Sequence, residues 1–253
     1  MSSSLVKFVQ HSECVGLITM NRIDRHHALN HELATALVDA LTVCEDDPAI
    51  SVVILTGAGD KAFCAGQDML EQSGIGQEQE APRSIAAYLA IDRFAQSPLP
   101  IIAAINGYCY GGGAALAISC DIRLAAESAT FRLPGAEYGL VVGAAAFPRL
   151  VGAARAKELI FTARKFNAME ADDWGFVNSV FPVEKLLEAA LDMAEIIGKN
   201  SPIAVQESKR VIDAATLDSA VVQLESDINA ELRGSADQVT RFENATKRVT
   251  GKF

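Results

Sequence analysis

Two glycine-bearing turns contain the residues whose types and spacing could stabilise a negatively charged oxygen in a reaction. The first ends the run VVILTGAGDKAFCAGQD, residues 52–68, and the second lies within IIAAINGYCYGGGAALA, residues 101–117. Each run passes from an apolar segment, through glycine, to a predicted helix start. Helix N-termini carry unpaired N–H groups and the positive end of the helix dipole. Two such turns side by side can aim two N–H donors at one developing oxyanion.

The glycines have a chemical and a structural interpretation. Because glycine has no Cβ, a ligand oxygen can approach the N–H groups of residues 111–113 closely. Glycine also permits tight turns between packed layers without any ligand, and for a single GGG run this is the commoner explanation. The occurrence of two turns of one design favours the chemical interpretation modestly, and both stay open on these residues alone.

These turns need a scaffold of alternating strands and helices. Apolar runs predict strands, and helical spacing predicts helices between them. The expected strands are residues 4–10, 14–20, 51–57, 101–105, 121–126 and 176–181, and the expected helices are residues 31–47 and about 83–96. The polar stretch 71–82 lacks periodicity, which is typical of a mobile surface loop. Repeated strand–strand–helix units of this kind wind into a right-handed parallel arrangement, so the predicted class is α/β.

The chain changes character after about residue 150, where nearly every segment has helical spacing. Residues 183–199, 202–215 and 217–232 are successive amphipathic helices with short joints. We therefore expect a core over residues 1–190 and a C-terminal helical region over residues 191–253.

Composition limits the classes of function. The 253 residues are 50% hydrophobic and carry a net charge of −10, which argues against an electrostatic nucleic-acid interface or a basic membrane patch. The five cysteines lack CxxC spacing, and the first 13 residues lack a signal-peptide core, which together indicate a cytoplasmic protein. The histidines of RHHALN, residues 25–30, lack metal-ligand spacing, so no metal site is expected.

Several motifs resemble, in order along the chain, those of the crotonase or enoyl-CoA hydratase/isomerase superfamily. The resemblance rests on AFCAGQD, residues 62–68, and NGYCYGGGAALAISCDIRLAA, residues 106–126, and extends from VGLITMNR to the helical tail. It implies a crotonase-like spiral of repeated ββα units with a C-terminal helical layer. It further implies that residues 191–253 form a trimerisation region, in a homotrimer or a dimer of trimers. The implied substrate is an acyl-CoA, with no cofactor beyond the CoA it carries.

The resemblance also implies a role for particular residues. In that family the thioester carbonyl lies between two backbone N–H groups, which here belong to Gln67 and Gly112. Such donors stabilise the enolate that forms when the α-carbon loses a proton or a leaving group. The residues that the resemblance places along the substrate are Arg22, His27, Ala62, Phe63, Cys64, Ala65, Gly66, Asp68, Tyr110, Gly111, Gly135 and Tyr138.

The sequence departs from the family where acid/base chemistry is expected. A hydratase of this kind has two glutamates, at positions that here hold Ala115 and Gly135, and a third position used by some isomerases holds Gly143. Hydration by the usual two-glutamate mechanism is therefore not expected. Glu137 is the best candidate for a relocated acid/base, with an ion-paired surface glutamate as the equal alternative.

Other residues near the glycine turns have structural explanations. Asp68 is expected to cap the helix that it begins, and Cys109 to belong to the core, because no histidine lies near it in the sequence. Tyr110 either lines the acyl pocket or packs beside the glycines.

Two functions of different kinds follow from this combination. The first is an acyl-CoA enzyme that works through an enolate, as an atypical hydratase/isomerase or as a decarboxylase or C–C hydrolase. The second is a non-catalytic acyl-CoA-binding protein that keeps the N–H donors without the chemistry. Nucleic acid and membrane are not expected partners, because the predicted helices are mostly acidic or mixed in charge.

Overall fold

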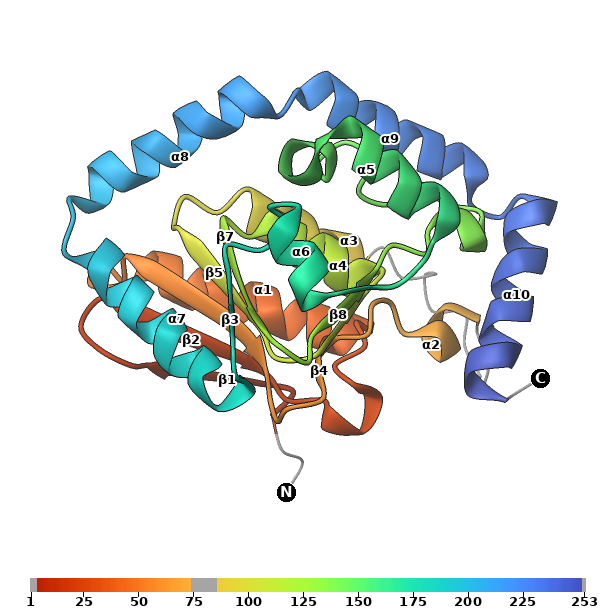
Figure 1. The fold of residues 1–253 in the computed structure, drawn as a ribbon. Coiled ribbons are helices and arrows are strands. Elements are labelled where there is room, and N and C mark those ends of the chain that lie inside the picture. Colours follow the sequence, from red (N-terminus) through yellow and green to blue (C-terminus); the bar gives the residue numbers. More distant parts are fainter. Residues whose placement is uncertain (1–3, 74–85, 252–253) are drawn as a thin grey trace.

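The structure is a computed structural model that describes residues 4–73 and 86–251. Its larger sheet has six strands in the order β1-β2-β3-β5-β7-β10 (Figure 1). Only the β1–β2 pair is antiparallel, and each later pair is parallel. The strands are β1 Val6–Gln10, β2 Val15–Met20, β3 Val52–Gly57, β5 Ile101–Ile105, β7 Ile122–Ala126 and β10 Ser179–Phe181.

A second, smaller sheet has the strand order β4-β6-β8-β9. Its strands are β4 Ala62–Cys64, β6 Tyr108–Tyr110, β8 Thr130–Arg132 and β9 Phe166–Asn167. Along the chain β4, β6 and β8 each follow a strand of the larger sheet, so the repeated strand–strand unit passes from one sheet to the other. The predicted α/β class with parallel strands is confirmed. The predicted strand at 176–181 is too long, because only Ser179–Phe181 is extended.

Helices cover the larger sheet on both faces. The helices up to α7 are α1 His31–Asp46, α2 Met69–Ser73, α3 Ala86–Ala95, α4 Gly112–Ser119, α5 Pro148–Thr162, α6 Ala168–Asp173 and α7 Val183–Gly198, with 3-10 turns η1 Ile23–Arg25 and η2 Ala136–Tyr138. Helix α1 packs on one face and α7 on the other. The helix predicted at 83–96 is present over residues 86–95. Of the stretch 71–82 that was expected to be a loop, residues 71–73 belong to α2 and the rest lies outside the described residues.

The sheet is apolar on both faces because two separate helix layers pack on it. Val53 and Leu55 of β3 belong to the cluster that contains α1 and α4 residues. Their neighbours Val52 and Ile54 point the other way, into a cluster with α7. A fully buried and mostly apolar strand such as β3 is typical of a parallel sheet covered on both faces.

The C-terminal helices are α8 Pro202–Thr216, α9 Ser219–Leu232 and α10 Ala236–Thr250. Figure 1 shows α8 and α9 as an arch above the sheets and α10 running down one side of the molecule. The boundary expected at residue 190 falls inside α7, which packs on the larger sheet, so the division into core and C-terminal region stays a prediction. Within the described ranges, no helix combines the length and apolar character needed to cross a membrane.

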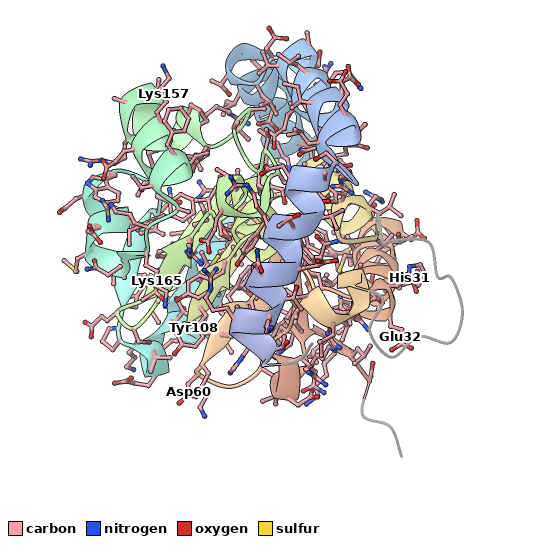
Figure 2. All side chains as sticks on the ribbon, turned by 90° about the vertical axis from the view of Figure 1, so that its right-hand side faces the viewer. His31, Glu32, Asp60, Tyr108, Lys157 and Lys165 are labelled. Atoms are coloured by element: carbon pink, nitrogen blue, oxygen red, sulfur yellow. The ribbon has the colours of Figure 1, made fainter. Side chains whose placement is uncertain are left out.

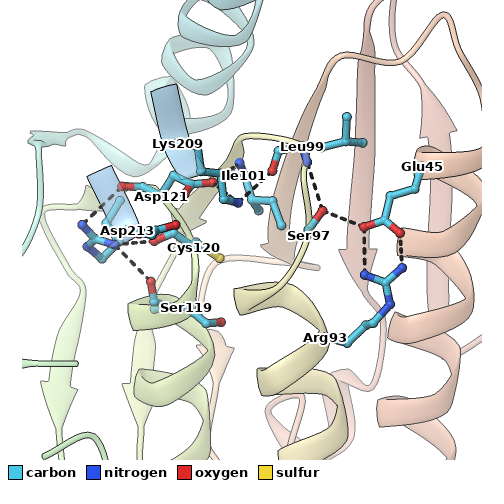
Figure 3. Close-up of polar contacts among 12 residues, drawn as sticks. Glu45, Arg93, Ser97, Leu99, Ile101, Ser119, Cys120, Asp121, Lys209 and Asp213 are labelled. Carbon is cyan, nitrogen blue, oxygen red and sulfur yellow. Dashed lines mark hydrogen bonds and ion pairs between the residues drawn. The ribbon is translucent and has the colours of Figure 1, made fainter. Parts of the chain in front are cut away.

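One ion pair ties α8 to the larger sheet (Figure 3). The Nζ atom of Lys209 lies 2.9 Å from Oδ2 of Asp121 and donates to the carbonyl of Leu99 at 3.0 Å. The same Asp121 oxygen accepts from the N–H of Ile101 at 2.7 Å. Burial raises the pKa of Asp121, and the Lys209 ammonium opposes that shift. α8 itself has no buried residue, so this contact anchors a helix that is otherwise exposed.

A second polar contact in the same view joins α1 to α3. Arg93 of α3 forms an ion pair with Glu45 of α1, and Ser97 donates to Glu45 at 2.7 Å (Figure 3). This pair fixes α3 beside α1, and α3 in turn packs against α4.

Candidate active site

The two glycine turns lie directly against each other. Gly66 has a φ of +96°, which favours glycine, and a Cβ placed on it would lie 2.6 Å from the carbonyl oxygen of Tyr110. The same Cβ would lie 3.1 Å from the nitrogen of Gly112. The absence of a side chain at Gly66 therefore allows the first turn to approach the start of α4.

Hydrogen bonds around Gln67 set the direction of its N–H group. The N–H group of Leu29 donates to the carbonyl of Gly66 at 2.7 Å, and the carbonyl of Leu29 accepts from the N–H of Asp68 at 2.9 Å. Successive N–H groups of an extended segment point to opposite sides. The Gln67 N–H thus points away from Leu29, towards α4, and a Cβ placed on Gly112 would lie 3.4 Å from the Gln67 nitrogen.

Each glycine of the second turn has its own requirement. Gly111 has a φ of +52°, and its N–H group donates to the carbonyl of Arg132 at 2.9 Å. Gly111 is therefore the residue at which β6 ends and α4 begins. A Cβ on Gly113 would lie 2.2 Å from the carbonyl oxygen of Cys64, so only glycine fits there. Gly112 is the first residue of α4, and a helix leaves its first N–H groups without an intrahelical acceptor. The two turns therefore place the backbone nitrogens of Gln67 and Gly112 near each other.

Comparisons with known proteins identify the family of the chain. The sequence profile of the enoyl-CoA hydratase/isomerase family matches residues 10–246. The chain belongs to this family. It is 35% identical over 230 residues to a short-chain-enoyl-CoA hydratase of Clostridium acetobutylicum, covering 88% of each protein.

Solved structures of the enoyl-CoA hydratase/isomerase family have the same fold. An enoyl-CoA hydratase from Bacillus anthracis matches with a TM-score of 0.78 and 36% identity, over 98% of this chain and 97% of that one. A monofunctional enoyl CoA isomerase from M. smegmatis matches with a TM-score of 0.73 and 30% identity, over 85% and 94%. Enzymes of the family need no cofactor beyond the CoA of their substrate.

The two positions without glutamate differ in the space around them. Ala115 is half-buried on α4, one turn beyond Gly112. A Cβ on Gly135 would lie 2.9 Å from both the carbonyl oxygen of Leu140 and the Cγ2 atom of Val142. Segment 140–142 therefore fills the volume that a side chain at position 135 would need.

Glu137 has the ion-paired environment that was the alternative to an acid/base role. One of its carboxylate oxygens pairs with Arg132 and the other with Arg248 of α10. The neighbouring Tyr138 packs edge-on against Phe242 of α10, with ring centroids 6.2 Å apart. Both residues join η2 to α10, and the geometry favours a structural role for Glu137.

Glu137→Gln should therefore change stability more than chemistry. Loss of the charge-assisted contacts with Arg132 and Arg248 is expected to cost about 1 kcal/mol, or about 2–4 °C in Tm. A displaced general acid/base would instead cost about 10²–10⁴ in rate. Thermal unfolding and kcat of the variant separate the two roles. The control is Glu243→Gln, which changes an exposed glutamate of α10. A hundredfold lower kcat with an unchanged Tm would show that Glu137 acts as an acid or base in the reaction.

The side chains of Arg22 and Asp68 hold the first turn together. Arg22 pairs with Asp68 at 2.6 Å and donates to the carbonyl of Ala28 at 2.7 Å. The second carboxylate oxygen of Asp68 accepts from the N–H groups of Leu70 at 3.0 Å and Glu71 at 3.3 Å, at the start of α2. The predicted cap at Asp68 is confirmed, and Arg22 is committed to the turn rather than extended towards a nucleotide.

His27 is also a structural residue, which corrects the expected contact between its side chain and the nucleotide. It is 1% exposed, its Nδ1 accepts from the N–H of Arg22, and its Nε2 lies 3.1 Å from the carbonyl of Ala58. One ring nitrogen accepts and the other donates, which requires the neutral imidazole. Burial lowers the pKa of His27, in agreement with that neutral form.

The remaining residues of AFCAGQD form the inner wall of the turn. The side chains of Ala62, Phe63 and Cys64 are buried in the core, and Ala65 is half-buried. Burial raises the pKa of the Cys64 thiol to about 12, so this thiol is not a nucleophile at neutral pH. Cys109 is likewise buried, as expected, with its pKa raised well above the ordinary value by burial.

An aromatic row that the sequence did not predict borders the second turn. The ring of Tyr110 stacks on Tyr108 at 5.5 Å, and His26 meets Tyr108 edge-on at 5.9 Å. Lys165 places its Nζ atom 5.4 Å from the centre of the Tyr110 ring, and the Tyr110 hydroxyl bonds to Thr130 at 2.7 Å. Figure 2 shows Tyr108 and Lys165 on the face along which α10 runs. Tyr110 therefore packs within this row, and the short strand pair β8–β9 brings Lys165 to it.

Proposed function

We propose that this chain acts on an acyl-CoA thioester by holding the carbonyl oxygen between the N–H groups of Gln67 and Gly112. The observation that carries the proposal is the close approach of the two turns at Gly66 and Gly112. Two donors at the carbonyl oxygen stabilise the enolate, and one such donor is worth about 10²–10³ in rate in a comparable acyl-transfer site. The family of the chain supports a CoA thioester as the substrate class.

The proposed reaction is an atypical one for the family. Ala115 and Gly135 provide no carboxylate, so the usual two-glutamate hydration is not part of the proposal. A hydratase or isomerase step with one displaced acid/base agrees with the names of the relatives. Decarboxylation or C–C cleavage needs less proton transfer, because the electron pair of the broken C–C bond becomes the enolate. Positioning of the substrate alone supplies about 7–11 kcal/mol in favourable cases.

A non-catalytic acyl-CoA-binding protein is the second candidate. The observation that favours it is the filled space at Gly135, where Leu140 and Val142 leave no room for a catalytic side chain. Such a protein would bind thioesters through the same N–H groups without turning any of them over.

The first experiment is the loss of enone absorbance when the purified protein meets crotonyl-CoA. Butyryl-CoA binding, measured by calorimetry, is run in parallel, because it does not depend on turnover. Turnover supports an atypical hydratase. Binding without turnover of crotonyl-CoA, malonyl-CoA or acetoacetyl-CoA supports the silent binder, and no binding of any acyl-CoA contradicts the proposal.

The proposed assembly is a homotrimer or a dimer of trimers that uses residues 191–253. Its support is the exposed apolar side chains of α8, among which Ile203 is 74% exposed and Val211 63%. Light scattering on the purified protein measures the assembly directly. We also propose a cytoplasmic location, supported by five free cysteines, and no nucleic-acid or membrane partner, supported by the net charge of −10.

A further inference from the structure

Two side chains of α9 hold the segment of residues 140–145 by its backbone. Glu225 accepts from the N–H of Gly143 through Oε1 and from the N–H of Ala145 through Oε2, both at 2.7 Å. Asn229, one helical turn further on, accepts from the N–H of Val141 at 2.9 Å and donates to its carbonyl at 2.6 Å. We call Glu225 and Asn229 the α9 clamp.

The clamp lies in a largely buried environment. Asn229 is 4% exposed, and burial raises the pKa of Glu225, while the N–H groups of residues 143–145 oppose that shift. A buried amide or carboxylate is costly unless its hydrogen bonds are made. Both side chains make theirs with the same segment, so the clamp fixes the position of that segment on α9.

The clamped segment lies beside Gly135 at one end and reaches α4 near Ile118 at the other. Leu140 and Val142 occupy the space beside Gly135, as described above. At the other end, a Cβ on Gly143 would lie 3.5 Å from the Cδ1 atom of Ile118 on α4. Ile118 is one turn beyond Ala115 on the same helix.

One row of residues along α4 leads from the proposed binding site of the thioester oxygen to segment 140–143. Gly112, Ala115 and Ile118 follow each other at helical neighbour spacing, and the rise from the first to the last is about 9 Å. An acyl group whose carbonyl oxygen is held at Gly112 can extend along Ala115, which has only a methyl group. Segment 140–143 then lies across its path at Ile118.

We propose that the α9 clamp positions segment 140–143 as the end wall of the acyl site, so that Glu225 and Asn229 determine which acyl lengths bind. Both are positioning residues, since they act through the backbone of residues 141–145. This inference rests on the proposed function, because it assumes that the thioester carbonyl is held at Gly112. Short acyl groups fit in front of the wall, and longer ones require it to move.

The test compares the binding of butyryl-CoA and decanoyl-CoA by calorimetry. Glu225→Ala and Asn229→Ala should each shift the ratio of the two Kd values by about tenfold or more towards decanoyl-CoA. Glu225→Gln, which keeps one acceptor oxygen, should give a smaller shift. Glu231→Ala removes an exposed carboxylate from the same helix and should leave the ratio unchanged. If Glu225 and Asn229 had only a structural role, their replacement would lower Tm without changing the ratio of the two Kd values.

The outcomes separate the inference from the proposed function. An unchanged ratio in folded Glu225→Gln and Asn229→Ala overturns the inference alone, and these two variants decide the matter if Glu225→Ala does not fold. A wild type that binds neither acyl-CoA overturns both proposals. A wild type that binds both acyl-CoAs but turns over no enoyl-CoA contradicts only the enzymatic reaction, because the ratio of Kd values still tests the wall.

Discussion

Gly112→Ala is expected to lower kcat/KM for crotonyl-CoA at least about 100-fold without unfolding the protein. The added methyl would lie 3.4 Å from the Gln67 nitrogen and 3.6 Å from Leu29 Cδ1, which are ordinary contact distances. Gly112 begins α4 with no positive φ, so alanine fits its backbone. In the proposed site the methyl would nevertheless lie beside the Gln67 nitrogen, in the space through which the carbonyl oxygen would approach.

Steady-state kinetics and thermal unfolding of the same preparation measure both parts of this prediction. Gly113→Ala is the contrasting variant, because its Cβ would lie 2.2 Å from the backbone oxygen of Cys64. That variant should lose stability as well as activity. Wild-type kcat/KM in a folded Gly112→Ala protein would remove Gly112 from the oxygen site. If the wild type is a silent binder, the same variant should weaken butyryl-CoA binding.

Lys209→Met is expected to destabilise the protein by about 1–3 kcal/mol, the cost of leaving a partly buried carboxylate without its partner. The side chains of Lys209 and Asp121 are 10% and 24% exposed, so water replaces the missing ammonium poorly. The variant also frees α8 from the carbonyl of Leu99. Urea unfolding at a fixed protein concentration measures the loss.

The pH dependence gives a further check on Lys209→Met. Burial raises the pKa of Asp121 in the folded state above its value in the unfolded chain. Protonated Asp121 therefore favours the folded state, and this contribution to stability is complete at low pH. It is lost as the pH rises through the folded-state pKa. Removing Lys209 takes away the opposing charge and raises this pKa further. The deficit of the variant should thus shrink as the pH falls from 7 towards 4. The double variant Asp121→Asn, Lys209→Met should recover most of the stability, and a deficit equal to that of the single variant would rule out the charge as the cause.

The main strands could be predicted from the sequence because each has a clear physical signature. β3 and β5 are fully buried and almost entirely apolar since helices cover both faces of their sheet, and such runs stand out from the turns around them. The strands of the smaller sheet have only two or three residues, which is too short for any period to show. Their pairing depends on the path of the whole chain.

The same distinction applies to the site. The residue types within each turn predicted that backbone could approach closely at the glycines, whereas the pairing of the two turns at one site came from the family resemblance. The contact between Glu137 and Arg248 joins residues 111 positions apart, and that between Glu225 and Gly143 joins residues 82 apart. No local pattern links such pairs, because the course of α8 and α9 brings them together. Consequently the sequence left two equal alternatives for Glu137, an acid/base role and an ion-paired surface role, and gave no role to Glu225.

The burial of the cysteines has a practical consequence for assays. Cys44, Cys64, Cys109 and Cys120 are buried, and burial raises the pKa of each thiol, to about 12 for Cys44, Cys64 and Cys120 and well above the ordinary value for Cys109. Because the thiolate is the reactive form, these four side chains do not compete for a disulfide dye at neutral pH. A disulfide dye added to the native protein is therefore expected to react first with half-buried Cys14 among the five cysteines.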